Sequence, residues 1–320
     1  MTTPLFLHCN CVEQGQSIPE MCRLAVVWGF DGLEFRRVRP GLTEKPTDYL
    51  DAIASARDKT GLKRVSFGGP GPDLMNPDPS VRRRETDACL AFYEEATRRF
   101  EMTVCNTMTG TLLASNTPYL EFDKNGSACA TAEQWEWAIA GFREIGDAVA
   151  KRGLKLAFET HNCFLHDLPK PARELVERIE RNNIGLNFDY GNILLHPLGV
   201  PQAEAWATCA DRVFLVHVKN LYKLPGHRYY NFIPCPLADG AITWTLDTFG
   251  GVQSARPLAN GNVLIAAQAG TDVVLTEVDA RILLLDFLGF VAPFQELVEG
   301  TSGDQDVRQR GHVADGRVIG

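Results

Sequence analysis

Three apolar segments of this chain each end in a residue type that binds divalent metal ions. LKLAFE ends at Glu159, IGLNFD at Asp189 and RVFLVH at His217. Each segment has the composition of a buried strand, and the carboxyl ends of parallel strands in a closed barrel meet at one rim. The three side chains are therefore predicted to converge on one cation. No cysteine joins them, so the group suits Mn, Mg, Co or Zn.

Strand-like and helix-like segments alternate along the chain as far as His217. The predicted strands are 4–8, 31–35, 62–67, 102–106, 154–159, 184–188 and 212–217. The predicted helices are 19–30, 47–59, 80–100, 131–152, 170–181 and 202–210. Alternation of this kind builds either a parallel barrel or a doubly wound open sheet.

The barrel is favoured because seven strands are already present by His217, and no GxGxxG motif follows the first strand. Further along, 262–268 reads as the eighth strand, between a weak helix at 241–258 and a helix at 276–290. We therefore expect the α/β class and a single (β/α)8 TIM barrel over residues 1–299. The charged, glycine-rich residues 300–320 are expected to form a flexible C-terminal extension.

Charge and cysteine content narrow the partners and the compartment. The net charge is −8, which gives no electrostatic reason to expect nucleic acid or an anionic membrane as a partner. Nine cysteines are scattered without a CxxC pair, as is typical of a reducing cytoplasm. The first residues, MTTPLFLHCN, lack the basic region of a signal peptide, and no apolar run is long enough for a membrane span.

Four blocks resemble the signature blocks of the xylose-isomerase-like barrel superfamily, the sugar phosphate isomerase/epimerase group. They are AFETHN (157–162), LNFDYGN (186–192), FLVHVKN (214–220) and LADGAITW (237–244). The resemblance covers about residues 4–292 and implies that Glu159, Asp189 and His217 are three of four metal ligands. It also implies Mn, Mg or Co as the usual ion, with Mn the first expectation here.

The fourth ligand of this group is a glutamate at the end of the eighth strand, where this chain aligns Ala266. An alanine side chain neither binds metal nor carries a proton. Four explanations stay open: a deliberate replacement, an amide oxygen from Gln268, a site with three protein ligands, or a different alignment in which Glu277 is the ligand. Glu277 fits less well, because it reads as part of a helix start.

A cation bound to a carbonyl and its neighbouring hydroxyl acidifies the C–H bond between them. Glu159 is then the expected base, and isomerases of the group are understood to pair it with the strand 8 glutamate. His161, two residues further on, is a candidate acid, and a loop histidine bonded to backbone is the alternative. Lys219 is a candidate to neutralise an enolate oxygen, and a rim ion pair is its alternative.

Four further residues are predicted to line the substrate site. Glu34 and Asn106 end the second and fourth strands and face the barrel mouth if the strand registers are right. His166 lies on the loop after the fifth strand, where a hydrogen bond to Asp167 or to backbone is the alternative. Asn192 either orients substrate or forms a turn.

These residues predict a metal-dependent isomerase or epimerase that acts on a keto-sugar or related polyol, or a cyclitol. One alternative is a lyase or dehydratase that works by β-elimination, and another is a non-catalytic partner subunit that has lost the fourth ligand. A DNA-repair nuclease on the same barrel is disfavoured by seven histidines and the acidic charge. A homo- or hetero-oligomer is compatible with the sequence, which does not fix its size.

Overall fold

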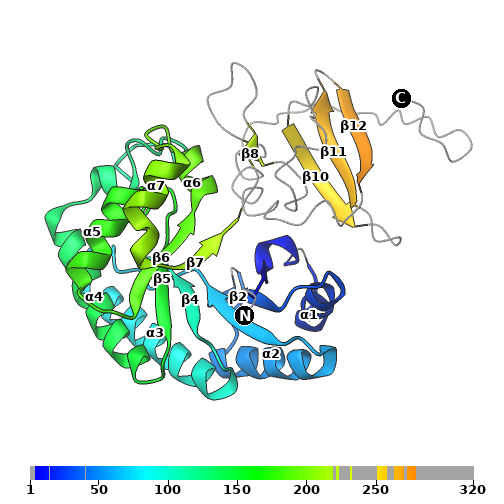
Figure 1. Cartoon of the computed structure of the whole chain (residues 1–320), viewed down its shortest axis with the longest axis horizontal. Coiled ribbons are helices and arrows are strands. Elements are labelled where there is room, and N and C mark those ends of the chain that lie inside the picture. Colours follow the sequence, from blue (N-terminus) through cyan, green and yellow to red (C-terminus); the bar gives the residue numbers. More distant parts are fainter. Residues whose placement is uncertain are drawn as a thin grey trace, which may run out of the picture. The chain divides into compact units, whose positions relative to one another are not determined.

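The computed structural model describes residues 4–218, apart from 14 and 40, and five strand segments further along the chain. Those segments are 221–222, 231–232, 251–257, 263–269 and 272–278. Lys219 and the predicted extension at 300–320 lie outside the described residues. Figure 1 shows the described elements, coloured along the sequence.

Seven parallel strands form the wall of a barrel. They are β1 (Phe6–His8), β2 (Gly32–Arg36), β3 (Arg64–Gly68), β4 (Val104–Thr107), β5 (Lys155–Glu159), β6 (Ile184–Asp189) and β7 (Val213–His217). They pair in the order β1-β2-β3 and β4-β5-β6-β7, and every pair is parallel. Strands β3 and β4 lie next to each other between the two groups. The seven strands predicted up to His217 are thus confirmed.

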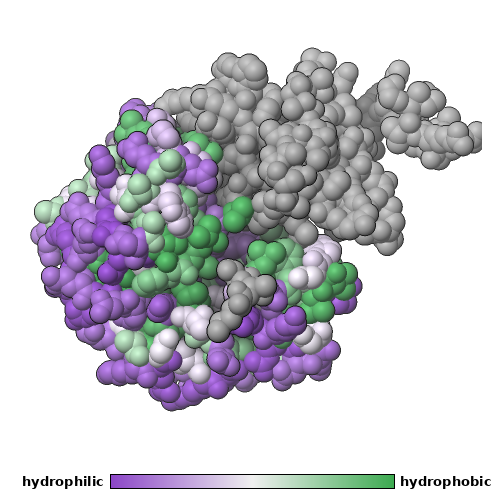
Figure 2. All heavy atoms as spheres, in the orientation of Figure 1, coloured by the Kyte–Doolittle hydropathy of each residue, from purple (hydrophilic) through white to green (hydrophobic). Residues whose placement is uncertain are grey.

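Helices follow the strands and cover the outer side of this wall (Figure 1). They are α1 (Ile18–Val27), α2 (Pro46–Thr60), α3 (Pro79–Arg99), α4 (Ala132–Ala150), α5 (Pro169–Ile179), α6 (Tyr190–Leu195) and α7 (Gln202–Cys209). Short 3-10 turns occupy η1 (Cys9–Cys11), η2 (Gly126–Cys129) and η3 (Ala210–Arg212). Figure 2 shows hydrophilic residues over the outer helices, as expected where helices face water. No described helix combines the length and apolar character that a membrane crossing requires.

Local signals in the sequence set the helix ends. Ser17 caps α1, where its side chain accepts the N–H of Glu20. Thr131 and Gln134 form a capping box at the start of α4. Helix α2 ends at Gly61, whose φ of 75° suits a left-handed cap. Helix α6 was not predicted, because it starts directly after β6 with Asp189 as its cap.

Alternate residues of the strands pack against the helices. Phe35 of β2 and Phe67 of β3 are fully buried, and Phe67 meets Phe92 of α3 edge to face at a centroid distance of 4.9 Å. On the same outer face of the wall, further around the barrel, Phe158 of β5 meets Phe142 of α4 at a centroid distance of 4.5 Å. Because side chains alternate along a strand, the neighbouring positions Glu34 and Glu159 point to the opposite side, into the barrel.

The C-terminal strands differ from the prediction. Segment β11 (Val263–Ala269) pairs antiparallel with both β10 (Gly251–Pro257) and β12 (Asp272–Val278), so the prediction that 262–268 is an eighth parallel strand is wrong. Glu277, expected at a helix start, lies within β12, and the described part of the helix predicted over 241–258 is also a strand. Only two residues separate β11 from β12. A link this short can join two antiparallel strands but not two parallel ones.

One further short pair, β8 (Leu221–Tyr222) with β9 (Asn231–Phe232), is antiparallel as well. It lies in the stretch that was expected to be a loop over the rim. The apolar pattern of a short strand does not reveal the direction of its neighbours, which explains why 262–268 was wrongly predicted to pair in parallel.

A buried carboxyl group anchors the loop that follows β5. Asp167 is fully buried, accepts the N–H of Ser127 at 3.0 Å and lies 3.9 Å from Nε2 of His196. Gly126 has a φ of 63°, and a Cβ there would overlap the Asp167 carboxylate, so this position requires glycine. Burial raises the pKa of Asp167 to about 6 from an ordinary value of 3.8.

The raised pKa of Asp167 gives a pH-dependent stability. The protonated carboxyl group is favoured in the folded state, so its contribution is complete below pH 4 and is lost as the pH rises through about 6. The free energy of unfolding of the wild type should therefore fall by about 3 kcal/mol as the pH rises, and that of Asp167→Asn should not. Urea denaturation of both proteins between pH 4 and pH 7 measures the difference. Asp58→Asn, on an exposed helix surface, is the matched control, and equal slopes for wild type and Asp167→Asn would contradict the assignment.

Candidate metal centre

The strand registers place polar side chains side by side at the carboxyl ends of the barrel strands. His8 of β1 lies opposite Glu34 of β2, and Asp189 of β6 lies opposite His217 of β7. Glu159 of β5 lies opposite Asn187, which is two residues before Asp189 on β6. Glu159 therefore lies deeper in the barrel than Asp189. Residues at these positions share the inner face of the wall, so they approach one another across the barrel.

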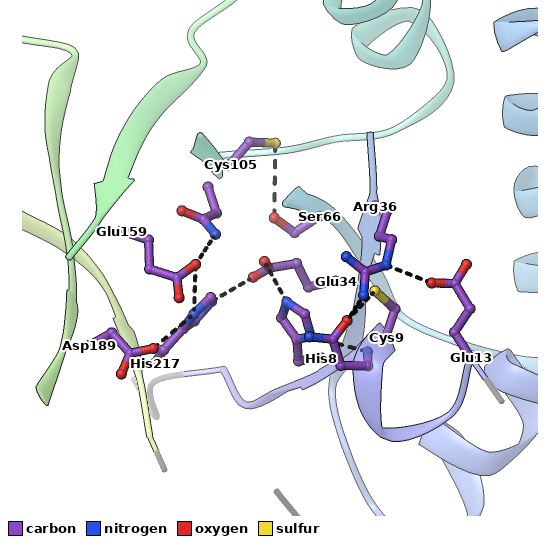
Figure 3. Close-up of polar contacts among 12 residues, drawn as sticks. His8, Cys9, Glu13, Glu34, Arg36, Ser66, Cys105, Glu159, Asp189 and His217 are labelled. Carbon is purple, nitrogen blue, oxygen red and sulfur yellow. Dashed lines mark hydrogen bonds and ion pairs between the residues drawn. The ribbon is translucent and has the colours of Figure 1, made fainter. Parts of the chain in front are cut away.

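The three predicted metal ligands do come together (Figure 3). Nδ1 of His217 lies 3.4 Å from Oε2 of Glu159 and 3.7 Å from Oδ2 of Asp189. One donor atom from each of the three residues lies within 4.8 Å of the others. Ligand atoms about 2.0–2.3 Å from a shared ion are separated by distances of this order.

Two asparagines hold the carboxylates in place. Asn106 donates to Oε2 of Glu159 at 2.8 Å, and Asn192 donates to its Oε1 at 2.9 Å. The backbone N–H of Asn192 also donates to Oδ1 of Asp189 at 3.0 Å. Both asparagines were predicted to bind substrate. In the structure, both orient the candidate ligands directly.

Thr160 ties the ends of β5 and β6 together. Its hydroxyl donates to the carbonyl oxygen of Asp189 at 3.0 Å and accepts the N–H of the same residue at 2.9 Å. The backbone N–H of Thr160 in turn donates to the carbonyl of Asn187 at 3.1 Å. These bonds fix the offset between Glu159 and Asp189, on which the spacing of the two carboxylates depends.

Glu34 and His8 form a second group on the far side of the His217 ring. Nε2 of His217 lies 3.2 Å from Oε2 of Glu34, and Nε2 of His8 lies 3.7 Å from Oε1 of Glu34. Glu34 was predicted to face the barrel mouth, and the structure places it there. His8 was missed, although its place at the end of the first predicted strand was an available signal.

The electrostatics of the centre are dominated by three buried acids around one imidazole. Burial lowers the pKa of His217, but the Glu34 and Glu159 carboxylates outweigh it, so the pKa lies well above its usual value. Burial raises the pKa of Glu34, yet the opposing pull of His217 and His8 leaves it below its usual value. His217 and His8 together can offset at most two of the three carboxylates, so the centre favours an additional positive charge.

The donor set therefore fits a divalent cation. Carboxylate oxygen and imidazole nitrogen are the ligands that Mn, Mg, Co and Zn accept, and the carboxylates of Glu159 and Asp189 are at most 4% exposed. Among the described residues, Glu159, Asp189 and His217 would hold such an ion. Gln268, the candidate fourth ligand, lies in β11, and its side chain is outside the described residues, as is Lys219.

His166 lies on the loop after β5, as predicted, and makes the hydrogen bonds to backbone that were the alternative to substrate binding. It is fully buried, its Nδ1 donates to the carbonyl of Glu159, and its Nε2 accepts the N–H of Thr109 at 3.3 Å. Burial lowers its pKa to about 4, so the ring stays neutral. With both nitrogens bound to backbone, His166 supports the end of β5, and the substrate-binding prediction for it is corrected.

His161 is only partly buried, and its Nδ1 lies 3.0 Å from the carbonyl of Asn162. Its ring also meets Phe164 edge to face. This is the backbone-bonded loop position that was the alternative to a catalytic acid. The role of His161 in proton transfer stays a prediction.

Solved structures with the same fold include two that carry a bound molecule. D-allulose 3-epimerase from Methylomonas sp., in complex with D-allulose, is 13% identical with a TM-score of 0.56, over 76% of this chain and 77% of that one. A xylose isomerase-like TIM barrel protein from Mycobacterium smegmatis, in complex with magnesium, is 18% identical with a TM-score of 0.57, over 75% and 82%. A probable 3-DHS dehydratase from Bacillus anthracis is 16% identical with a TM-score of 0.50, over 69% and 74%.

No curated protein sequence matches the chain. The model of the family described as "Xylose isomerase-like TIM barrel" matches residues 22–246, which is more than half of the 320 residues. The resemblance carried by the four sequence blocks is thereby confirmed. This chain belongs to the xylose isomerase-like TIM barrel family.

Proposed function

We propose that this protein is a divalent-metal-dependent sugar isomerase or epimerase of the cytoplasm. Its substrate is a keto-sugar or a related polyol, and its reaction begins with removal of a proton next to a carbonyl. The observation that carries the proposal is the convergence of Glu159, Asp189 and His217, from three successive strands, with donor atoms within 4.8 Å of one another. Mn is the first candidate for the ion, with Mg, Co and Zn as alternatives.

A bound divalent ion would polarise a substrate carbonyl and stabilise the negative charge that develops when the neighbouring C–H bond is broken. The protein groups supply the rest. Glu159 accepts the proton, because its carboxylate is the one held by two amide donors at the inner end of the group. Asp189 and His217 would hold the ion beside this carboxylate.

The amide bonds to Glu159 matter for its reactivity. Asn106 and Asn192 hold the carboxylate plane, so the proton-accepting oxygen keeps one direction toward the substrate. Glu159 is 4% exposed, so little bulk water reaches its carboxylate. A base that is oriented and dehydrated in this way suits abstraction from carbon.

Two of the structural neighbours support the choice of substrate and ion. One of them binds D-allulose and is named a 3-epimerase, and the other binds magnesium. At 13–18% identity these likenesses establish the fold. The substrate class enters the proposal because the site residues of this chain provide the matching chemistry.

Elimination is the second candidate reaction. Return of a proton to the opposite face of the substrate asks for a second base, and the described residues include no eighth parallel strand to carry one, since 262–268 pairs antiparallel on both sides. A dehydratase or lyase needs only one base and a leaving group, and the dehydratase from Bacillus anthracis has the same fold. A non-catalytic partner subunit is the third reading, and metal binding separates it from the two enzymes.

Metal binding should stabilise the folded protein. At a Mn²⁺ concentration 100 times the dissociation constant, the expected gain in the free energy of unfolding is about 2.7 kcal/mol, and EDTA should abolish it. Asp189→Asn removes a ligand charge but keeps an oxygen to cap α6, so it should fold and lose most of the gain. Thermal denaturation with and without Mn²⁺ measures this. Asp147→Asn, at a surface pair with Arg181, is the control, and an absent gain in wild type would favour the non-catalytic subunit.

Glu159→Gln should remove the base while leaving its two asparagine partners a side chain of the same shape. Turnover should fall by about 10²–10⁴-fold. The assay follows D-allulose and other ketoses with Mn²⁺ in D₂O, where mass spectrometry detects solvent deuterium in the product. Glu174→Gln, at a surface pair with Arg178, is the control. An epimer that carries deuterium identifies epimerisation, and an unsaturated product identifies elimination. Full activity in Glu159→Gln would exclude this residue as the base.

A further inference from the structure

We propose that Glu34 is a positioning residue that fixes the His217 ring, and that His8 fixes Glu34 in turn. The inference deepens the proposed function and rests on His217 as a metal ligand. It assigns a role to a carboxylate and an imidazole that the proposed reaction does not use. The two residues come from β1 and β2, on the opposite side of the barrel from the other ligands.

The two nitrogens of His217 face different partners. Nδ1 faces Glu159 and Asp189, at 3.4 and 3.7 Å, and Nε2 faces Oε2 of Glu34 at 3.2 Å. A neutral imidazole that offers the Nδ1 lone pair to a cation carries its proton on Nε2. Glu34 is placed to accept that proton in a hydrogen bond. A carboxylate behind a ligating histidine fixes both the tautomer and the ring orientation.

The next contact is an ion-pair approach of His8 to Glu34, which is longer than a hydrogen bond. Nδ1 of His8 accepts the backbone N–H of Asn10 at 3.1 Å, so the proton of a neutral His8 ring lies on Nε2. That nitrogen lies 3.7 Å from Oε1 of Glu34, the oxygen that does not face His217. The rings of His8 and His217 stand edge to face at a centroid distance of 5.3 Å. Glu34 is thus held between two imidazoles, one on each oxygen (Figure 3).

The barrel keeps a closely fitting space for the Glu34 side chain. Glu34 is 3% exposed, and a Cβ at Gly68 of β3 would overlap its Oε1. A carboxylate confined in this way has few alternative rotamers. Rigid placement is what a group needs in order to orient a ligand, and it distinguishes Glu34 from a carboxylate at a flexible rim.

The same residues offer a second grouping, since donor atoms of His8, Glu34 and His217 also lie within 4.8 Å of one another. A second cation there would compete for Nε2 of His217 while the first uses Nδ1. Both ring nitrogens would then have to be free of protons. A hydrogen bond from Nε2 to Glu34 requires no such loss, so the geometry favours positioning, and binding of two ions is an outcome that the experiment separates.

The experiment measures Mn²⁺ binding to the full chain by titration calorimetry. Glu34→Ala should weaken binding by about 10–100-fold without changing the stoichiometry of one ion. Glu34→Gln should lose less Mn²⁺ affinity, because its amide oxygen can still accept the Nε2–H of His217. The Mn²⁺ affinity of His8→Ala should lie between that of the wild type and that of Glu34→Ala. Glu20→Gln, at a surface pair with Arg23 on α1, is the matched control and should bind as wild type does.

Proton NMR of the metal-free protein tests the same contact without the metal. The Nε2–H resonance of His217, assigned by its absence in His217→Gln, should lie downfield in wild type, shift in Glu34→Gln and vanish in Glu34→Ala. If Glu34→Ala does not fold, Glu34→Gln and His8→Ala decide the outcome in both measurements.

The outcomes separate the two proposals. Unchanged Mn²⁺ affinity and an unchanged Nε2–H resonance in the folded Glu34 variants would overturn the positioning role. Two ions in wild type and one in Glu34→Ala would overturn it in favour of a second cation. If wild type binds no Mn²⁺, the proposed function fails, and the loss or persistence of the Nε2–H resonance still decides whether Glu34 holds His217.

Discussion

The candidate site depends on the placement of one imidazole ring between carboxylates on both of its edges. His217 reaches Glu159 and Asp189 through Nδ1 and Glu34 through Nε2. Because the ring is rigid, each acid on one edge constrains the position of those on the other. Three buried acids with only two imidazoles near them also favour a divalent ion at the site. The proposed reaction and the positioning role of Glu34 both follow from this arrangement.

The surrounding structure serves to hold these groups still. Asn106 and Asn192 orient Glu159, and Thr160 fixes the offset of β5 and β6. Behind them, the buried loop after β5 is held by His166 and Asp167, which bond to backbone groups. A site of this kind is precise because its ligands stand on strands whose relative heights are fixed by the sheet, and the polar residues around them leave little rotational freedom.

Much of the fold could be predicted from the chain alone. Seven strands and the six long helices between them follow from apolar runs, caps such as Thr131 and terminators such as Gly61. These signals are local, so they can be read from the sequence without knowledge of the tertiary contacts. The segment 262–268 shows the limit. Its apolar run predicts a strand correctly, but pairing direction depends on which neighbours it meets, and β11 is antiparallel to both.

The sequence by itself determined that Glu159, Asp189 and His217 stand at the ends of successive strands, since strand ends and residue types are local features of the sequence. Only the tertiary structure decided which side chains touch them. It brought in His8, made Asn106 and Asn192 partners of Glu159, and bonded both ring nitrogens of His166 to backbone groups. The physical reason is that such contacts depend on the offset between strands and on the direction of each side chain on a curved wall. Those quantities are set jointly by residues up to 209 positions apart, as for His8 and His217.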